Sequence, residues 1–188
     1  MNPKRQKGFV SEAGCYANVR ILHELTHQMK KSGGGVGIQL DVSKAFDTVP
    51  HEAIPIALKR KGGTPYRHFF NLVLEPLLER LEHMPGLPLP GESGISCLAF
   101  ADDLFLFATD PSKAQDLLIV QVEELGSLGM TIAANKSCAY RIKSSKDSWF
   151  MEDPGVERIG EKIPVCTPEN KITYGCSYSY GQDSISNQ

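Results

Sequence analysis

Three aspartates lie within apolar, strand-like segments of the sequence. Asp41 follows Gly-Ile-Gln-Leu, and Asp102 and Asp103 stand between Leu-Ala-Phe-Ala and Leu-Phe-Leu-Phe. A carboxylate in apolar surroundings is costly unless it is hydrogen-bonded, protonated or bound to a cation. Three carboxylates that converge from adjacent strands suit Mg²⁺, which prefers oxygen ligands, and such sites catalyse nucleotidyl transfer with two metal ions. Taken alone, the Asp102-Asp103 pair fits an ordinary turn equally well, and Asp41 fits a solvent-facing strand end.

The flanking patterns predict the elements that position these carboxylates. Apolar residues at helical spacing predict a helix over residues 16–31, which the glycines at 33–35 end, and alternating apolar residues predict a strand over 36–42. Two apolar runs around the acidic centre predict a β-hairpin over 95–108. The remaining patterns predict helices from about 51 to 62, over 66–83 and over 112–128, a loop over 84–94, and short strands at 130–134 and 138–142.

The composition is that of a globular chain. Its 188 residues are 41% apolar and 22% charged, which excludes wholesale disorder and indicates one domain's length. With a net charge of −2, nucleic-acid binding would depend on local basic patches. No apolar run is long enough for a membrane span and no signal peptide is recognisable, so we expect a nuclear or cytoplasmic protein that is not secreted.

The five cysteines are widely scattered, at positions 15, 97, 138, 166 and 176. No pair has the close spacing of a zinc knuckle, and an odd, dispersed set does not indicate a disulfide framework. We therefore expect reduced and mostly buried thiols. Pairing of Cys166 with Cys176 across a hairpin is the lesser alternative.

The run Leu-Asp-Val-Ser-Lys-Ala-Phe-Asp-Thr-Val-Pro-His and the later run Phe-Ala-Asp-Asp belong to a set of five segments. These two runs resemble the first and second catalytic motifs of the reverse transcriptases of non-LTR, R2-like retrotransposons, and all five segments follow the order of that family. Three further segments resemble the stretch that precedes the palm, the helix that follows the B motif, and the motif that carries a lysine near the triphosphate. The five segments are residues 40–51, 100–103, 6–9, 70–81 and 129–137.

The resemblance implies an α+β fold, a partial right-hand polymerase palm whose antiparallel sheet carries helices on one face. It also implies RNA-directed DNA polymerase activity with two Mg²⁺ ions, deoxynucleoside triphosphates, an RNA template and a DNA primer. No membrane, heme or organic cofactor is implied. Asp41 and Asp102 would bind both ions, the Val42 carbonyl would be a further ligand, and Asp103 would support metal binding.

The resemblance assigns two more residues to the nucleotide. Phe46 matches the aromatic residue that underlies the incoming sugar and selects deoxynucleotides; its alternative is simple core packing. Lys136 matches the lysine near the leaving pyrophosphate, where a cation stabilises developing negative charge. On its own, Lys136 would be interpreted as a solvated surface lysine.

The sequence also departs from the family. Only 61 positions separate Asp41 from Asp102, because residues 63–68 run almost directly into the helix at 70–81. The glycine-glutamine-glycine-aspartate loop of the B motif, which packs on the nascent base pair, is therefore missing. The basic residues of the fingers are absent, and residues 169–180 lack the core of the primer grip. Because positioning dominates this chemistry, we expect little or no activity.

We accordingly divide the chain into partial fingers and palm over residues 1–143 and a degenerate palm-to-thumb tail over 144–188, partly disordered. A second hypothesis is a non-catalytic relic that binds nucleic acid or a partner, which predicts salt-sensitive RNA binding without the catalytic aspartates. A third, a two-carboxylate hydrolase, lacks a general acid or base at a persuasive spacing.

Overall fold

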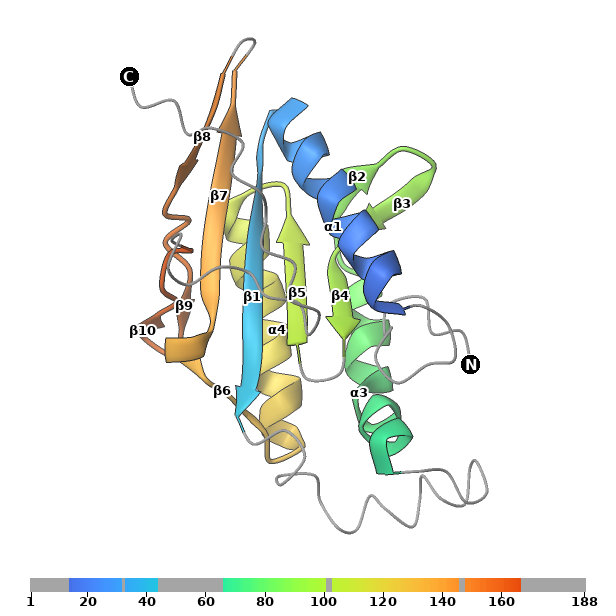
Figure 1. The fold of residues 1–188 in the computed structure, drawn as a ribbon. Coiled ribbons are helices and arrows are strands. Elements are labelled where there is room, and N and C mark those ends of the chain that lie inside the picture. Colours follow the sequence, from blue (N-terminus) through green and yellow to red (C-terminus); the bar gives the residue numbers. More distant parts are fainter. Residues whose placement is uncertain (1–13, 32, 44–65, 101–102, 146–147, 167–188) are drawn as a thin grey trace.

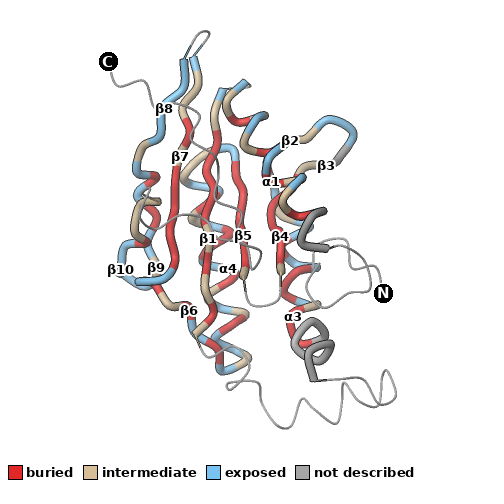
Figure 2. Tube along the Cα trace, viewed as in Figure 1, coloured by how far each residue is buried: buried red, intermediate tan, exposed pale blue. Residues whose placement is uncertain are grey.

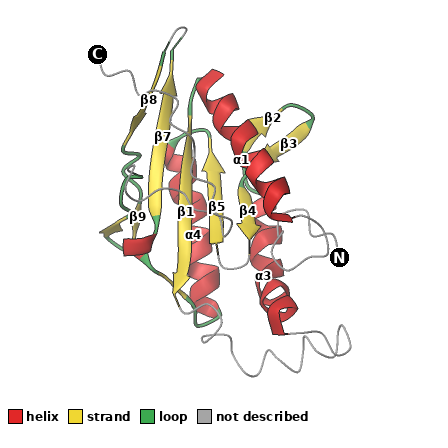
Figure 3. Ribbon diagram, in the orientation of Figure 1, coloured by secondary structure: helices red, strands yellow, loops and turns green. Residues whose placement is uncertain are grey.

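The computed structural model describes residues 14–31, 33–43, 66–100, 103–145 and 148–166. Its centre is an antiparallel sheet with the strand order β4-β5-β1-β7-β8, and β6 pairs with the end of β1 (Figure 1). These strands are β1 Gly35–Ser43, β4 Cys97–Phe100, β5 Asp103–Ala108, β6 Thr131–Ile132, β7 Cys138–Ser144 and β8 Trp149–Glu152. The described helices are α1 Gly14–Lys31, α3 Tyr66–Glu82 and α4 Pro111–Ser127, with a 3₁₀ turn η1 at Ala134–Lys136 (Figure 3). The sequence therefore predicted the α+β class correctly.

Helices cover both faces of the sheet, whereas the resemblance implied helices on one face. On one face, α3 and α4 form a core with alternate residues of β1, namely Val36, Ile38, Leu40 and Val42. On the other face, α1 packs against Phe105, Phe107 and Tyr140. The expectation of one covered face was wrong because β5 and β7 also carry large apolar side chains on the second face, which water would otherwise solvate. Figure 2 shows the resulting buried strands between the helices.

Local sequence explains how α4 begins and how α1 is attached to the sheet. In α4, the Asp110 carboxylate accepts a hydrogen bond from the Lys113 amide at 3.0 Å, and Pro111 opens the first turn. In α1, Leu22, Leu25 and Met29 form the buried stripe. The side-chain amide of Asn18 donates to the Ala99 carbonyl at 2.9 Å, which ties α1 to β4.

Gly37 permits the close approach of β1 to a large side chain of β7. Its register partner is Tyr140, and a Cβ added at Gly37 would lie 2.4 Å from Cζ of that ring. Both residues are buried, so the ring has taken the space that a side chain on β1 would need. The glycine is therefore a packing requirement at the centre of the sheet.

Two segments carry more structure than their patterns indicated. Residues 84–94, expected to be a loop, contain a hairpin of β2 Leu87–Leu89 and β3 Glu92–Ile95. Leu87 pairs with Ile95, and both are buried against α1, so packing stabilises a Pro- and Gly-rich segment as a hairpin. After residue 144, β8 extends the main sheet, and β9 Glu157–Arg158 pairs with β10 Glu161–Lys162. The weak pattern of β8 reflects its exposure, since Phe150 is 55% and Met151 48% exposed.

A disulfide joins Cys138 of β7 to Cys166, and this corrects the expectation of reduced thiols at these two positions. The pairing arises because the chain after β10 returns along β7, where the Ala139 amide donates to the Pro164 carbonyl and the Cys166 amide to the Ala139 carbonyl. The alternative partner, Cys176, lies outside the described residues, as does the helix expected from about 51 to 62. Cys97 is buried, as expected for a core thiol.

Candidate functional site: two aspartates at the end of the sheet

Asp41 and Asp103 are register partners on the neighbouring strands β1 and β5. Directly paired residues point to the same face, with Cβ atoms about 5 Å apart, and this is the face covered by α1. Both residues are partly buried, and they form the last register pair between β1 and β5, next to the apolar pair Leu40–Leu104. The structure therefore brings two of the three predicted carboxylates together.

The pair is chemically suited to a divalent cation. Two like charges placed opposite each other destabilise an antiparallel pair, and a bound cation would remove that repulsion. The donor atoms are carboxylate oxygens, which Mg²⁺ prefers over nitrogen and sulfur. Within the described residues, no group of three or more His, Cys, Asp or Glu side chains could hold a metal ion. Asp41 and Asp103 are the two predicted carboxylates that lie in this part of the chain.

At Asp41, strand β1 changes its neighbour. Gln39 pairs with Cys138 of β7, whereas Val42 pairs with Ile132 of β6, so three steps along β1 correspond to six along the partner chain. The extra residues form η1. Because β1 changes from β7 to β6 here, the backbone of Asp41 has no regular ladder partner on the side of β1 that faces these two strands.

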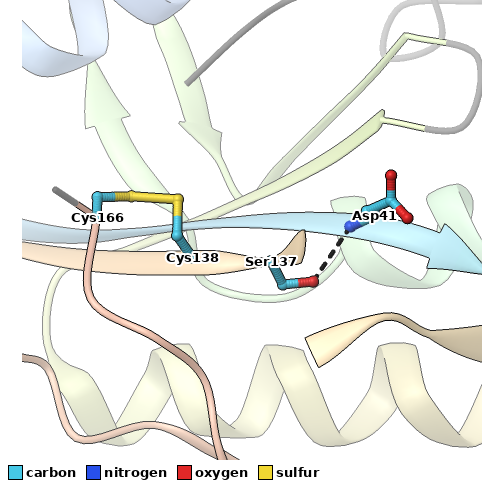
Figure 4. The surroundings of a disulfide bond; sticks show 4 residues. All are labelled: Asp41, Ser137, Cys138 and Cys166. Atoms are coloured by element: carbon cyan, nitrogen blue, oxygen red, sulfur yellow. Dashed lines mark hydrogen bonds between the residues drawn. A yellow bond between two sulfur atoms is a disulfide. The ribbon is translucent and has the colours of Figure 1, made fainter. Parts of the chain in front are cut away.

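Ser137 supplies the missing partner. Its hydroxyl accepts a hydrogen bond from the Asp41 amide at 3.2 Å and donates one to the Ala133 carbonyl at 2.8 Å. The Ala133 amide in turn donates to the Asp41 carbonyl at 2.9 Å. Figure 4 shows the Ser137 hydroxyl at the amide of Asp41, with the carboxylate pointing away from it. The main chain of Asp41 is thus fixed on both its donor and its acceptor.

Lys136 is exposed on the turn that this arrangement holds. It is the last residue of η1, and its own amide donates to the Ala133 carbonyl at 3.0 Å. The same carbonyl accepts from the Ser137 amide and hydroxyl. The turn that carries Lys136 is therefore anchored next to the end of β1, and the expected role of Lys136 near the leaving pyrophosphate stays a prediction.

Three other predicted site residues are not tested by this geometry. Asp102 and Phe46 lie outside the described residues. The side chain of Val42 is buried in the core formed with α3 and α4, and its carbonyl stays a predicted ligand. Sequence reasoning missed Ser137 altogether. The only signal for it was its place directly after Lys136 in the segment 129–137, because a lone serine carries no pattern that reveals a long-range contact with Asp41.

Comparison with known families shows where the chain belongs. The family described as reverse transcriptase (RNA-dependent DNA polymerase) matches residues 60–174. This stretch is more than half of the chain and includes Asp102, Asp103 and Lys136, whereas Asp41 and Phe46 precede it. None of the described helices is long and apolar enough to cross a membrane.

Curated relatives give the same result. The chain is 30% identical over 179 residues to the retrovirus-related Pol polyprotein of the type-2 retrotransposable element R2DM of Drosophila melanogaster, over 74% of this chain and 17% of that protein. It is 28% identical over 182 residues to the Pol polyprotein of a type-1 retrotransposable element R2 of Popillia japonica, over 74% of this chain and 26% of that protein. The chain thus spans about a quarter or less of the length of these relatives.

The alignments are longer than the part of this chain that they cover. In the first, 74% of 188 residues is about 139, against 179 aligned positions, so about 40 positions have no counterpart here. The Popillia alignment has 182 positions over the same share of the chain and shows a similar excess. From the family match and these similarities, we conclude that the chain belongs to the reverse transcriptase (RNA-dependent DNA polymerase) family, with R2 non-LTR retrotransposon Pol polyproteins among its relatives.

Proposed function

We propose that this chain is a fragment of a non-LTR retrotransposon RNA-directed DNA polymerase that retains the metal-binding end of a partial palm but has little or no polymerase activity of its own. The observation that carries the proposal is the pairing of Asp41 with Asp103 at one end of an antiparallel sheet, in a chain of the reverse transcriptase family. The substrates would be deoxynucleoside triphosphates, an RNA template and a DNA primer.

In this proposal the acidic residues hold divalent cations. Asp41 and Asp102 would be the principal ligands, Asp103 and the Val42 carbonyl would support them, and two Mg²⁺ ions would supply activation of the primer hydroxyl and neutralisation of phosphate charge. The chain's own part is to hold the two carboxylates on one face of β1 and β5, while the pair Leu40–Leu104 next to them is buried in the core on the opposite face. Lys136 would lie near the leaving pyrophosphate, and Phe46 would contact the incoming sugar.

The gap in the alignments supports the proposed loss of activity. We place the gap of about 40 positions between residues 63 and 70, where the template-contacting loop of the family is expected. Without that loop, the substrates would not be held in a reactive geometry, and positioning supplies most of the rate enhancement of phosphoryl transfer. Sequencing the transcript across the codons for Gly63 to Phe70 tests whether the gap is genuine, because an insert there would restore the loop and a continuous transcript would leave a relic.

Primer extension tests the activity. Purified protein is given an RNA template, a DNA primer, deoxynucleoside triphosphates and Mg²⁺, and is compared with the Asp102→Asn/Asp103→Asn double variant. We expect little extension from either protein. Clear Mg²⁺-dependent extension that is lost in the double variant would contradict the proposed inactivity and establish a working polymerase.

Cation binding tests the retained site separately from catalysis. Titration with Mn²⁺, followed by its paramagnetic effect on water relaxation, should show binding by the wild type and a large loss in Asp41→Asn. Asp116→Asn, on the exposed face of α4, is the matched control and should bind as the wild type does. Salt-sensitive RNA binding that survives Asp41→Ala, without any Mn²⁺ binding, would instead identify the chain as a non-catalytic relic.

The division into a palm over residues 1–143 and a tail over 144–188 remains part of this proposal. The pairing of β8 with β7 supports a tail that begins as the edge of the same sheet. A nuclear or cytoplasmic location agrees with an element that copies itself through RNA and DNA, and we retain it as a proposal. Immunolocalisation of the tagged chain in its host cells tests it.

A further inference from the structure

We propose that Ser137 is a positioning residue for the Asp41 carboxylate and for the turn that carries Lys136. The inference rests on the proposed function, since it gives Ser137 a role only if Asp41 binds a cation. It goes beyond the aspartates themselves, because it concerns how Asp41, which pairs with β5 but has no ladder partner on the β7 side, is kept in one conformation.

The hydrogen bonds of Ser137 define the role. One hydroxyl links the amide of Asp41 to the carbonyl of Ala133, residues that are far apart in the chain. The Ala133 amide returns a bond to the Asp41 carbonyl, so the two residues form a closed set of bonds through Ser137. Rotation of Asp41 about its main-chain torsions would break at least one of these bonds, and a carboxylate whose main chain is fixed needs less ordering when it binds a cation.

Burial stabilises the hydrogen bonds of the Ser137 hydroxyl. Ser137 is only 2% exposed, so water cannot readily replace its hydroxyl at the Asp41 amide. The next residue, Cys138, is held by its disulfide to Cys166 and by pairing with Gln39. Ser137 thus lies between η1 and β7, and β7 is held by the disulfide and by its pairing with β1. Through its hydroxyl, Ser137 fixes the Asp41 amide relative to β7.

A buried serine elsewhere offers a matched control. The Ser96 hydroxyl donates to the Leu81 carbonyl at 2.6 Å and is 1% exposed, which makes it equal to Ser137 in burial and in the type of acceptor. The Ser96 hydroxyl joins the residue directly before β4 to α3, whereas the Ser137 hydroxyl joins η1 to β1. Removal of either hydroxyl should lower stability similarly, whereas only Ser137 should affect the site.

The experiment compares Mn²⁺ binding and amide exchange in the full chain. In Ser137→Ala, we expect Mn²⁺ affinity to fall about fivefold to tenfold, as the loss of one hydrogen bond implies, and the Asp41 amide to exchange with deuterium faster. Ser96→Ala should bind Mn²⁺ as the wild type does. Ser137→Thr, which keeps the hydroxyl, should restore most of the affinity. Thermal unfolding of each variant confirms that it is folded.

Each outcome bears on a different claim. If Ser137→Ala binds Mn²⁺ as tightly as the wild type, the positioning role is wrong while the proposed function stands. If Ser96→Ala weakens binding as much as Ser137→Ala, the effect is general destabilisation and the inference fails. Absence of Mn²⁺ binding by the wild type overturns the proposed function and the positioning role with it. Should Ser137→Ala fail to fold, Ser137→Cys, with a weaker acceptor of similar size, should bind with intermediate affinity, and wild-type affinity there would refute the role.

Discussion

Asp41 of β1 lies directly opposite Asp103 of β5, and both side chains point toward the face of the sheet that α1 covers. Like charges directly opposite each other destabilise an antiparallel pair, and a cation bound between the two carboxylates would relieve that repulsion. We therefore expect the aspartate pair to lower the free energy of unfolding of the metal-free protein, and we expect a bound divalent ion to raise it again. This coupling makes the site testable by unfolding measurements alone.

Neutralising Asp41 should make the metal-free protein more stable and should also abolish its response to a divalent cation. We expect Asp41→Asn to raise the free energy of unfolding in chelator by about 0.5 kcal/mol, because the like-charge pair is removed. Addition of Mg²⁺ should stabilise the wild type and leave the variant unchanged. Urea unfolding with and without Mg²⁺ measures both effects. Asp116→Asn serves as the control, and a Mg²⁺ response in Asp41→Asn equal to that of the wild type would count against the site.

Reduction of the Cys138–Cys166 disulfide should destabilise the fold. The bond closes a loop of 28 residues, and the chain-entropy estimate for such a loop is about 3 to 4 kcal/mol. We expect the urea midpoint of the wild type to fall on addition of a reductant. The Cys138→Ser/Cys166→Ser double variant should begin at the lower midpoint and show no response to reductant. An unchanged wild-type midpoint would show that the bond adds nothing to stability.

The start of α4 should depend on pH. The Lys113 backbone amide, which donates to the Asp110 carboxylate, is the largest of the contributions that lower the pKa of Asp110 from 3.8 to about 2. Because the folded pKa is below the unfolded one, the stabilisation is complete above about pH 4 and is lost as pH falls toward 2. Asp110→Ala should cost about 1 kcal/mol near neutral pH and much less at pH 2. Urea unfolding of the wild type and of Asp110→Ala at the two pH values measures this change in the free energy of unfolding. An equal loss at both pH values would contradict the role of the charged Asp110 carboxylate at the start of α4.

The glycine at position 37 should be hard to replace. Gly37→Ala should lower the free energy of unfolding by about 1 to 3 kcal/mol, because the added methyl meets the Tyr140 ring. Tyr140→Leu should lower it as well, through loss of buried area. In the double variant the two costs should be less than additive, since the smaller side chain makes room for the methyl. Strict additivity in a double-mutant cycle would show that the ring is not the obstacle.

Much of the fold followed from local patterns. The alternation of Val36, Ile38 and Leu40 predicted β1 within a residue at each end, and the run from 112 to 128 predicted α4 with a shift of one residue. These predictions succeeded because each element buries one face or stripe, which leaves a clear period in the sequence. The number of covered faces was not predictable in the same way, since Phe105 and Leu106 are both apolar and the pattern of β5 does not show that α1 covers one side.

The candidate site was predictable only where the residues were unusual. Carboxylates in apolar strands drew attention to Asp41 and Asp103, whose partnership the register now shows. Ser137 was not predictable, because its significance comes from a contact with a residue 96 positions away. The disulfide was missed for a similar reason: five scattered cysteines give no information about which two meet, and the return of the chain along β7 decides it.

The bond between Cys138 and Cys166 also determines what a protease would leave behind. Both β7–β8 and β9–β10 lie inside the covalent loop that it closes. A single cut between these strands would therefore yield two pieces that remain one molecule, migrating as such on a denaturing gel until a reductant is added. A nicked chain could keep both Asp41 and β7 in place, so a single gel band in the absence of reductant is no proof of an intact backbone.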